Sequence, residues 1–271
     1  MKTLYLDGRE SLAVRLDGPT LRVSAPERAD RLFPLRRVGR VVVRGQVEWS
    51  SEAWLACADR DVFVTFLTGE GAFRARLSGR RPKGRPLLDL GEALEAWLED
   101  AAGAERLRTW LDAEAQHARL RLSRQLYGAP ISSLAGELRN RIRDQALRYV
   151  SEQDRERLDR ELAGLLASHL ETLLTRVGIR PDDALLAVHG IDVSRAAADV
   201  LTWSLQIDKL RFLWRRQRIA ERRGARLGTA PRHAVVDFYE AHRETVEEAF
   251  RLTVARLHRY LIENLDHHAD R

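Results

Sequence analysis

The 271-residue sequence has one cysteine and no long apolar run, and both absences exclude broad classes of protein. A lone cysteine cannot form an intramolecular disulfide, and the apolar phrase LACA around Cys57 is typical of a small core residue. No run approaches the roughly 20 apolar residues that a membrane-spanning helix needs, and the N-terminal phrase MKTLYLDGRE is interrupted by charge too early for a signal peptide. We therefore expect a globular cytoplasmic protein with no membrane partner.

Several motifs that reveal an enzyme or a metal site are also missing. The chain has no glycine-rich phosphate-binding loop, no paired CxxC and no HExxH. Nucleotide hydrolysis, zinc fingers and zinc peptidases therefore lose support, because each depends on such fixed spacings. With 44% hydrophobic residues the chain can still bury a large core, and its length favours two domains over one.

The net charge of +6 is modest, but it is concentrated in residues 209–226 (KLRFLWRRQRIAERRGAR). This segment has eight basic residues and a single acid, Glu221, so the rest of the chain is close to neutral. Because a guanidinium group can pair with two phosphate oxygens at once, we expect the segment to bind nucleic acid or polyphosphate. The alternative is a solvated helix face. The basic residues are Lys209, Arg211, Arg215, Arg216, Arg218, Arg222, Arg223 and Arg226.

Two aromatic residues, Phe212 and Trp214, lie among these arginines. Aromatic side chains interleaved with basic ones are typical of surfaces on which nucleobases stack. The same residues could instead anchor the helix in the core. The sequence leaves both interpretations open.

The spacing of apolar residues changes near residue 85. Before it, short stretches rich in β-branched residues predict strands, and the phrase SSEAWLACADRD predicts one helix capped by Ser50 or Ser51. After it, apolar residues recur three and four apart. We therefore expect an α+β fold, with a small N-terminal β-sheet domain carrying one helix at 1–85 and a larger all-helical domain at 86–271. Its later helices are expected at about 134–150, 154–176, 192–220 and 231–266.

Features at and after residue 80 support a division of the chain near residue 85. The phrase RRPKGRP at 80–86 combines proline, glycine and positive charge, which suits a hinge that could also touch a phosphate backbone. Two apolar stripes at helical spacing are expected in the core. They are Leu94, Trp97 and Leu98, and Leu107, Trp110 and Leu111.

The run 178–203 contains the best candidate for a reaction centre. It sets His189 and Asp199 ten positions apart in an otherwise apolar region, with Asp192 expected to cap the helix that carries Asp199. An imidazole and a carboxylate can hold a divalent metal if a third oxygen ligand arrives from elsewhere. The alternative for His189 is a histidine that is hydrogen-bonded at the mouth of a core.

Phrases along nearly the whole chain resemble one protein family. MKTLYLDGRESLAVRLDGPTLRV is followed by VVVRG, LACADRDV and FLTGEG, in the order strand, helix, strand and glycine-marked hairpin. Further on, LLTRVGIRPDDALLAVHG resembles a passage that leads to a catalytic histidine, and AAADVLTW resembles the acidic helix after it. In this order the phrases resemble the CRISPR-associated spacer-acquisition integrase, the first numbered protein of that system.

This resemblance implies a function, a cofactor and partners. The family is a metal-dependent DNA endonuclease and integrase that joins short foreign DNA into a repeat array, with a glutamate, a histidine and an aspartate around Mg²⁺ or Mn²⁺. It implies a sheet domain that forms a homodimer, a helical domain that binds double-stranded or branched DNA, and a small ferredoxin-like partner subunit. His189 falls on the family's histidine, and Asp199 falls on the first acidic position of the following helix.

The sequence departs from the family pattern at two positions. Thr202 stands where a second acidic residue is usual, and the expected glutamate falls near Ile142 or Arg143, neither of which can bind a cation. Glu137 and Asp144 lie on the same predicted helix, so either could supply a displaced metal ligand, although the arginines around them repel a divalent ion.

Two hypotheses follow. The first is an active DNA integrase or endonuclease that uses His189 and Asp199 with a displaced third acid. The second is a DNA-binding or scaffolding member of the same family that has lost the chemistry. The basic segment supports DNA binding under both hypotheses.

Overall fold

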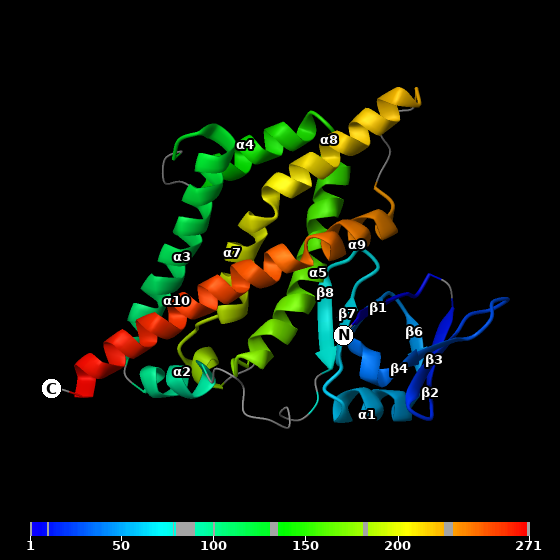
Figure 1. Ribbon diagram of the computed structural model, residues 1–271, viewed down its shortest axis with the longest axis horizontal. Coiled ribbons are helices and arrows are strands. Elements are labelled where there is room, and N and C mark those ends of the chain that lie inside the picture. The colour runs from blue at the N-terminus through cyan, green and yellow to red at the C-terminus, as the bar shows by residue number, and fades with distance from the viewer. Residues whose placement is uncertain are drawn as a thin grey trace. The chain divides into compact units, whose positions relative to one another are not determined.

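The chain divides into two compact units (Figure 1). Unit 1 consists of residues 1–85 together with 160–168, and unit 2 consists of 86–159 and 169–271. The middle of one long helix, α5 (Glu152–Arg176), therefore groups with the sheets. The computed structural model describes residues 2–9, 11–77, 79, 90–99, 101–130, 135–180, 184–224 and 230–269.

The described part of unit 1 contains eight strands in two sheets. They are β1 (Lys2–Asp7), β2 (Leu12–Asp17), β3 (Thr20–Ser24), β4 (Arg31–Pro34), β5 (Val38–Arg44), β6 (Val47–Trp49), β7 (Phe63–Leu67) and β8 (Phe73–Leu77). One sheet has the order β1-β5-β7-β8, with β5 parallel to both of its neighbours and β8 antiparallel to β7. The other has the order β4-β3-β2-β6. A short 3₁₀ turn, Leu35–Arg37, precedes β5.

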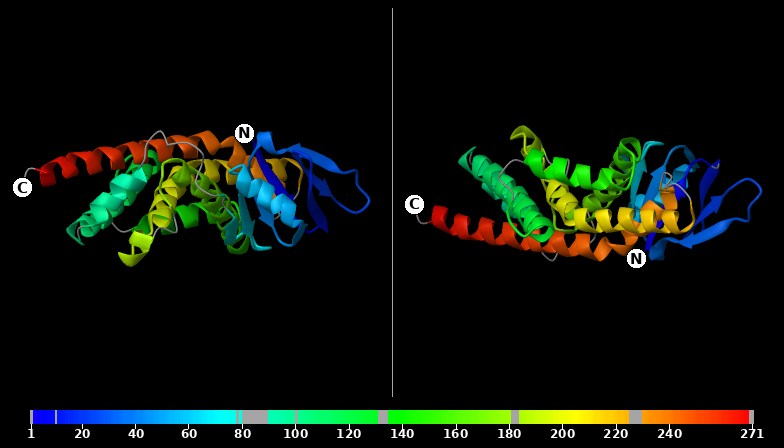
Figure 2. Two further views of the ribbon diagram at one scale, coloured as in Figure 1. Left: turned by 90° about the horizontal axis from the view of Figure 1, so that it is seen from below. Right: turned by 90° about the horizontal axis from the view of Figure 1, so that it is seen from above.

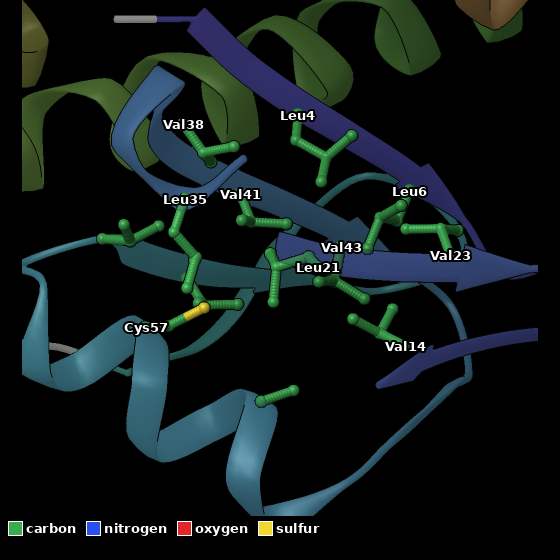
Figure 3. Packing of buried hydrophobic residues seen from close by; sticks show 13 residues of the cluster. Leu4, Leu6, Val14, Leu21, Val23, Leu35, Val38, Val41, Val43 and Cys57 are labelled. Atoms are coloured by element: carbon green, nitrogen blue, oxygen red, sulfur yellow. The ribbon is translucent and has the colours of Figure 1, made fainter. Parts of the chain in front are cut away.

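The core of unit 1 lies between these strands and one helix, α1 (Ser51–Asp59) (Figure 3). The VVV run is central because β5 is paired on both edges, and Val41 is fully buried. Cys57 is also fully buried and free, and burial raises the pKa of its thiol to about 11. The side chain of Ser50 caps α1 by accepting a hydrogen bond from the N–H of Ala53 at 3.3 Å. The predicted helix, its cap and the core cysteine are confirmed.

The turn between β7 and β8 packs tightly on the 160–168 segment of α5. A Cβ added to Gly164 would lie 2.0 Å from the carbonyl oxygen of Gly71. Arg44 joins the same contact, because it donates to the carbonyl of Gly69 at 2.8 Å and pairs with the buried Glu161 at 3.2 Å. The sequence pattern predicts this stretch as part of the helical domain at 86–271. Its grouping with the sheets differs because helical periodicity does not tell which element a helix packs against.

The described part of unit 2 is helical. Besides most of α5, it comprises α2 (Leu90–Leu98), α3 (Ala101–Tyr127), α4 (Ala135–Leu147), α6 (Ala184–Val188), α7 (Val193–Ser204), α8 (Gln206–Arg222), α9 (Arg232–Ala241) and α10 (Arg243–Ala269). Helix α10 runs along one side of the unit and contacts α2, α7 and α9 (Figure 2). The α+β class predicted from the sequence is confirmed. No described helix is long and apolar enough to cross a membrane.

The first predicted stripe of unit 2 is buried as expected. Trp97 is 3% exposed, and its indole N–H donates to the carbonyl of Gly103 at 2.7 Å. In the second stripe Leu107 is fully buried, whereas Trp110 is only partly buried and stacks on Tyr260 of α10. The hinge predicted at 80–86 lies outside the described residues.

The single helix predicted at 192–220 is wrong, because the chain forms α7 and α8 with a break at Leu205. The side-chain amide of Gln206 donates to the carbonyl of Thr202 at 3.2 Å, and the hydroxyl of Ser204 donates to the carbonyl of Leu201 at 2.6 Å. Both side chains compete for carbonyls that a continuous helix would bond to its own backbone. Apolar spacing does not report such local competition.

The single helix predicted at 231–266 is also wrong, because α9 ends at Ala241 and α10 begins at Arg243, with a break at His242. Nδ1 of His242 lies 2.7 Å from the carbonyl oxygen of Phe238, which would accept the backbone N–H of His242 in a continuous helix. That N–H donates instead to the carbonyl of Tyr239 at 3.1 Å. The apolar pattern continues through the break, so the two helices appear as one in the sequence.

Candidate functional site

The basic segment predicted from the sequence forms most of α8, which has two different sides. The buried side consists mainly of Lys209, Leu210, Leu213 and Ala220. Spacings of three and four residues put a second set on the opposite side of the helix, and these side chains are exposed. They are Arg211, Arg215, Arg218 and Arg222, here called the arginine face.

Four cations of the segment do not belong to the arginine face. Lys209 is 5% exposed, and its Nζ binds Oδ1 of Asp159 at 2.8 Å, so it points into the unit. Arg216 is partly buried, and this burial lowers its pKa although Asp154 opposes the shift. Arg223 is exposed just beyond the end of the helix. Arg226 lies outside the described residues.

The two aromatic residues of the segment have different environments. The ring of Phe212 packs on Phe238 of α9, with ring centroids 5.0 Å apart. Trp214 is 47% exposed, and the guanidinium of Arg218 lies 5.7 Å from the centre of its ring. Phe212 is therefore a core anchor, whereas Trp214 is a surface residue of the arginine face.

His189 lies in the turn that follows α6, next to Gly190, whose φ is +63°. Its Nε2 is 3.0 Å from the carbonyl oxygen of Leu98 at the end of α2. A carbonyl can only accept, so Nε2 carries the proton and Nδ1 is the acceptor in the neutral ring. Arg108 of α3 donates to the backbone carbonyl of His189. His189 is therefore partly buried and hydrogen-bonded, which agrees with the alternative interpretation of this residue.

The predicted acidic residues belong to α4 and to α7 with its cap. Asp192 caps α7 by accepting the N–H of Arg195 at 2.8 Å, as predicted. Asp199 is exposed on α7, and Asp144 is exposed on α4. Glu137 pairs with Arg141 one turn away at 2.7 Å. Among the residues that the structure describes, no three His, Cys, Asp or Glu side chains are grouped so that they could hold a metal ion.

Arginines occupy the face of α4 on which the family's glutamate was expected. Ile142 is 5% exposed and belongs to the apolar interior. Arg143 pairs with Glu152 of α5 at 2.8 Å, and the guanidinium of Arg139 lies 5.6 Å from the ring centre of Trp203 on α7. A divalent cation brought here would meet two guanidinium groups, and the carboxylate beside them, Glu152, is already paired with Arg143 and Arg155. The residues present therefore do not fit the metal that the resemblance implies.

A series of ion pairs, none of them predicted from the sequence, joins α4, α5 and α8. Arg143 binds Glu152, Glu152 binds Arg155 at 2.9 Å, Arg155 binds Asp159 at 2.6 Å, and Asp159 binds Lys209. Hydrogen bonds from Arg155 above all, and from Arg143, lower the pKa of Glu152 to about 2. The spacings of three and four between the α5 members were the available signal.

Comparisons with known proteins give this fold a family. The family model for CRISPR-associated protein Cas1 matches residues 4–168. A Cas1 protein from Thermotoga maritima has a similar structure with a TM-score of 0.72 and 13% identity over 97% of each chain. A casposase bound to its integration product has a TM-score of 0.67 and 14% identity over 97% of this chain and 91% of that one.

A Cas1 protein in complex with DNA has a TM-score of 0.60 and 14% identity over 94% of this chain and 91% of that one. No curated protein sequence matches this chain. At such low identity the structural matches show a shared fold, whereas the family model spans more than half of the sequence. The chain belongs to the family of CRISPR-associated protein Cas1.

Proposed function

We propose that this chain is a DNA-binding protein of CRISPR adaptation that holds DNA phosphates on the arginine face of α8. The carrying observation is the division of α8 into a buried side and a side with four exposed arginines. Exposed guanidinium groups can pair with phosphates without losing interior contacts. One similar structure is a Cas1–DNA complex and another is a casposase bound to its integration product, which supports DNA as the partner.

Family and fold make the chain an integrase- or endonuclease-like protein, and the described side chains favour binding over chemistry. They include no set of three metal ligands, and Arg139 and Arg143 add positive charge where the family's glutamate was expected. We therefore propose a DNA-binding or scaffolding member of the Cas1 family. No catalytic step through a metal is assigned to it.

One observation favours the competing hypothesis of an active enzyme that uses His189 and Asp199 with Mg²⁺ or Mn²⁺. The hydrogen bond from Nε2 of His189 to the Leu98 carbonyl leaves Nδ1 as the ring's acceptor. Histidines that bind metals are commonly held in this way through their other ring nitrogen. Glu137 or Asp144 would have to move toward this histidine to complete a site.

The remaining parts of the proposal come from the resemblance. Unit 1 would form the homodimer, and a small ferredoxin-like subunit would join it on double-stranded or branched DNA. A cytoplasmic location belongs to the same proposal.

Binding and chemistry are best tested on the same branched DNA. Binding is measured by fluorescence anisotropy with Mn²⁺ or with EDTA, and strand transfer and cleavage are measured with Mg²⁺ or Mn²⁺. Candidate partner subunits are added in a parallel series. We expect binding that weakens with salt, persists in EDTA and is not accompanied by strand transfer.

The variants His189→Ala and Asp199→Ala serve as matched controls. A metal-stimulated activity that disappears in both variants, while DNA binding remains, would establish the active enzyme instead. Absence of DNA binding at low salt would contradict both hypotheses.

A further inference from the structure

Trp214 is the one aromatic residue of α8 that the structure leaves at the surface. Trp214 is 47% exposed, whereas Phe212 two positions earlier is held against Phe238. A helix that needed Trp214 only for folding would turn it toward Leu210 and Leu213, which are buried on the other side. The exposed indole therefore calls for an explanation beyond the packing of unit 2.

The surroundings of Trp214 indicate what it would contact. Arg211 precedes it by three residues and Arg218 follows it by four, so these two arginines of the arginine face lie next to the indole on α8. The Arg218 guanidinium lies 5.7 Å from the ring centre. This cation can cover only one of the two ring faces, and it helps to hold the ring in place.

The positive charge around Trp214 favours DNA over an apolar protein surface as the binding partner. A protein partner that buried Trp214 would also cover neighbouring arginines and remove them from water, which is costly without an anion. A phosphate backbone supplies an anion for each guanidinium and brings a nucleobase to the ring. Bases within a duplex are already stacked on their neighbours, so a side chain on a helix surface reaches only an unpaired base.

We propose that Trp214 stacks on an unpaired nucleobase of a DNA strand whose phosphates bind the arginine face. The arginines supply affinity for any DNA, and Trp214 adds a preference for DNA with unpaired bases over a continuous duplex. The inference rests on the proposed DNA-binding function and names the feature of DNA that this face recognises.

The test compares three DNAs of matched length and charge. They are a continuous duplex, a duplex with a single-stranded overhang, and the same overhang with abasic sites. Dissociation constants are measured by anisotropy for the wild type, for Trp214→Ala and for Trp214→Phe. Ile219→Ala is the control, because Ile219 is 50% exposed on the same helix and is not aromatic.

The wild type is expected to prefer the overhang, and the abasic overhang is expected to bind like the duplex. Trp214→Ala should weaken overhang binding by about 5- to 150-fold, which corresponds to the loss of one stacked base, and leave duplex binding unchanged. Trp214→Phe should retain part of the preference. Tryptophan fluorescence is also recorded while the overhang DNA is added. Quenching that occurs in the wild type but not in Trp214→Phe comes from the indole of Trp214 and not from the other five tryptophans.

Two results would overturn the stacking proposal. One is an overhang preference that is unchanged in Trp214→Ala, and the other is an equal loss of duplex and overhang binding in that variant. The triple variant Arg211→Gln, Arg215→Gln, Arg222→Gln separates this failure from failure of the proposed function. If the triple variant loses binding to all three DNAs while Trp214→Ala changes nothing, the DNA surface stands and the stacking role fails.

Discussion

Lys209 binds Asp159 with 2.8 Å between Nζ and Oδ1, so the first cation of the basic segment faces the interior of the helical unit. Asp159 also binds Arg155 at 2.6 Å, so its carboxylate connects Arg155 of α5 with Lys209 of α8. The same segment therefore contains two kinds of cation. Lys209 fixes the helix to α5, whereas the exposed arginines make no interior contact, and one of them, Arg211, pairs with Asp208 at the surface at 3.2 Å.

This division predicts different effects for charge removals at Asp159, Lys209 and Arg215. Asp159→Asn leaves the buried ammonium of Lys209 without its anion and should lower the free energy of unfolding by about 1–3 kcal/mol. Lys209→Met should leave DNA affinity unchanged, because Lys209 does not reach the surface. Arg215→Met should weaken DNA binding and leave the free energy of unfolding unchanged. Urea denaturation and anisotropy on the three variants check this, and weaker DNA binding by Lys209→Met would contradict it.

The arginine face should set the salt dependence of DNA binding. Replacing Arg211, Arg215 and Arg222 by glutamine removes up to three phosphate contacts. The slope of log K against log salt should flatten by up to about 3, since each contact with duplex DNA contributes about 0.9. The control removes the same charge from unit 1 at Arg31, Arg36 and Arg37, which are exposed. Equal flattening in both triple variants would attribute the effect to net charge rather than to α8.

Gly164 should be required for the packing of α5 on the sheet unit. A Cβ there would lie 2.0 Å from the carbonyl oxygen of Gly71, so Gly164→Ala must displace backbone and should cost about 1–3 kcal/mol despite the higher helix propensity of alanine. Gly136→Ala in α4 is the matched control, because nothing lies within 4 Å of its added Cβ. We expect its stability to be unchanged or raised by up to about 1 kcal/mol. Equal changes in the two variants by thermal or urea unfolding would refute the steric explanation.

Glu152 should contribute to the loss of stability in acid. Its pKa is lowered to about 2 in the folded chain, chiefly by Arg155, whereas the ordinary pKa of a glutamate side chain is 4.5. A carboxyl with a depressed folded pKa stabilises the protein above its unfolded pKa and loses that contribution as the pH falls toward the folded pKa. Glu152→Gln should therefore be less sensitive to pH than the wild type between about pH 5 and pH 2.

Arg155→Gln tests the assigned cause of the lowered pKa of Glu152. It removes the largest cause of the lowered pKa. The stability of this variant should therefore also depend less on pH than that of the wild type between about pH 5 and pH 2. Unfolding curves at several pH values give the comparison. If stability falls as steeply with falling pH in both variants as in the wild type, Glu152 does not contribute to the loss of stability in acid.

Local signals in the sequence were sufficient for several features. The caps at Ser50 and Asp192, the buried Cys57 and the core position of Trp97 each follow from neighbouring residues. The change from strands to helices likewise follows from the periods of apolar residues.

Features that depend on tertiary partners could not be predicted in this way. Side chains break the helices at Leu205 and His242, and the sheet contact of Gly164 joins residues far apart in the sequence. Composition put Lys209 among the DNA-binding residues because a count of charges does not tell the inner side of a helix from the outer one. For the same reason Phe212 and Trp214 could be separated only by the structure.

The dispersion of the predicted metal ligands leads to a prediction that does not depend on enzymatic activity. An ion that binds the folded chain alone raises its stability, by about 2.7 kcal/mol at a concentration 100 times its dissociation constant. Because no three ligands are grouped in the described part of the chain, the melting temperature should be the same in EDTA, Mg²⁺ and Mn²⁺. The melting temperatures of His189→Ala and Asp199→Ala should likewise not change between EDTA, Mg²⁺ and Mn²⁺. A melting temperature that rises with Mn²⁺ in the wild type, but not in Asp199→Ala, would show that Asp199 is a metal ligand and would revive the active-enzyme hypothesis.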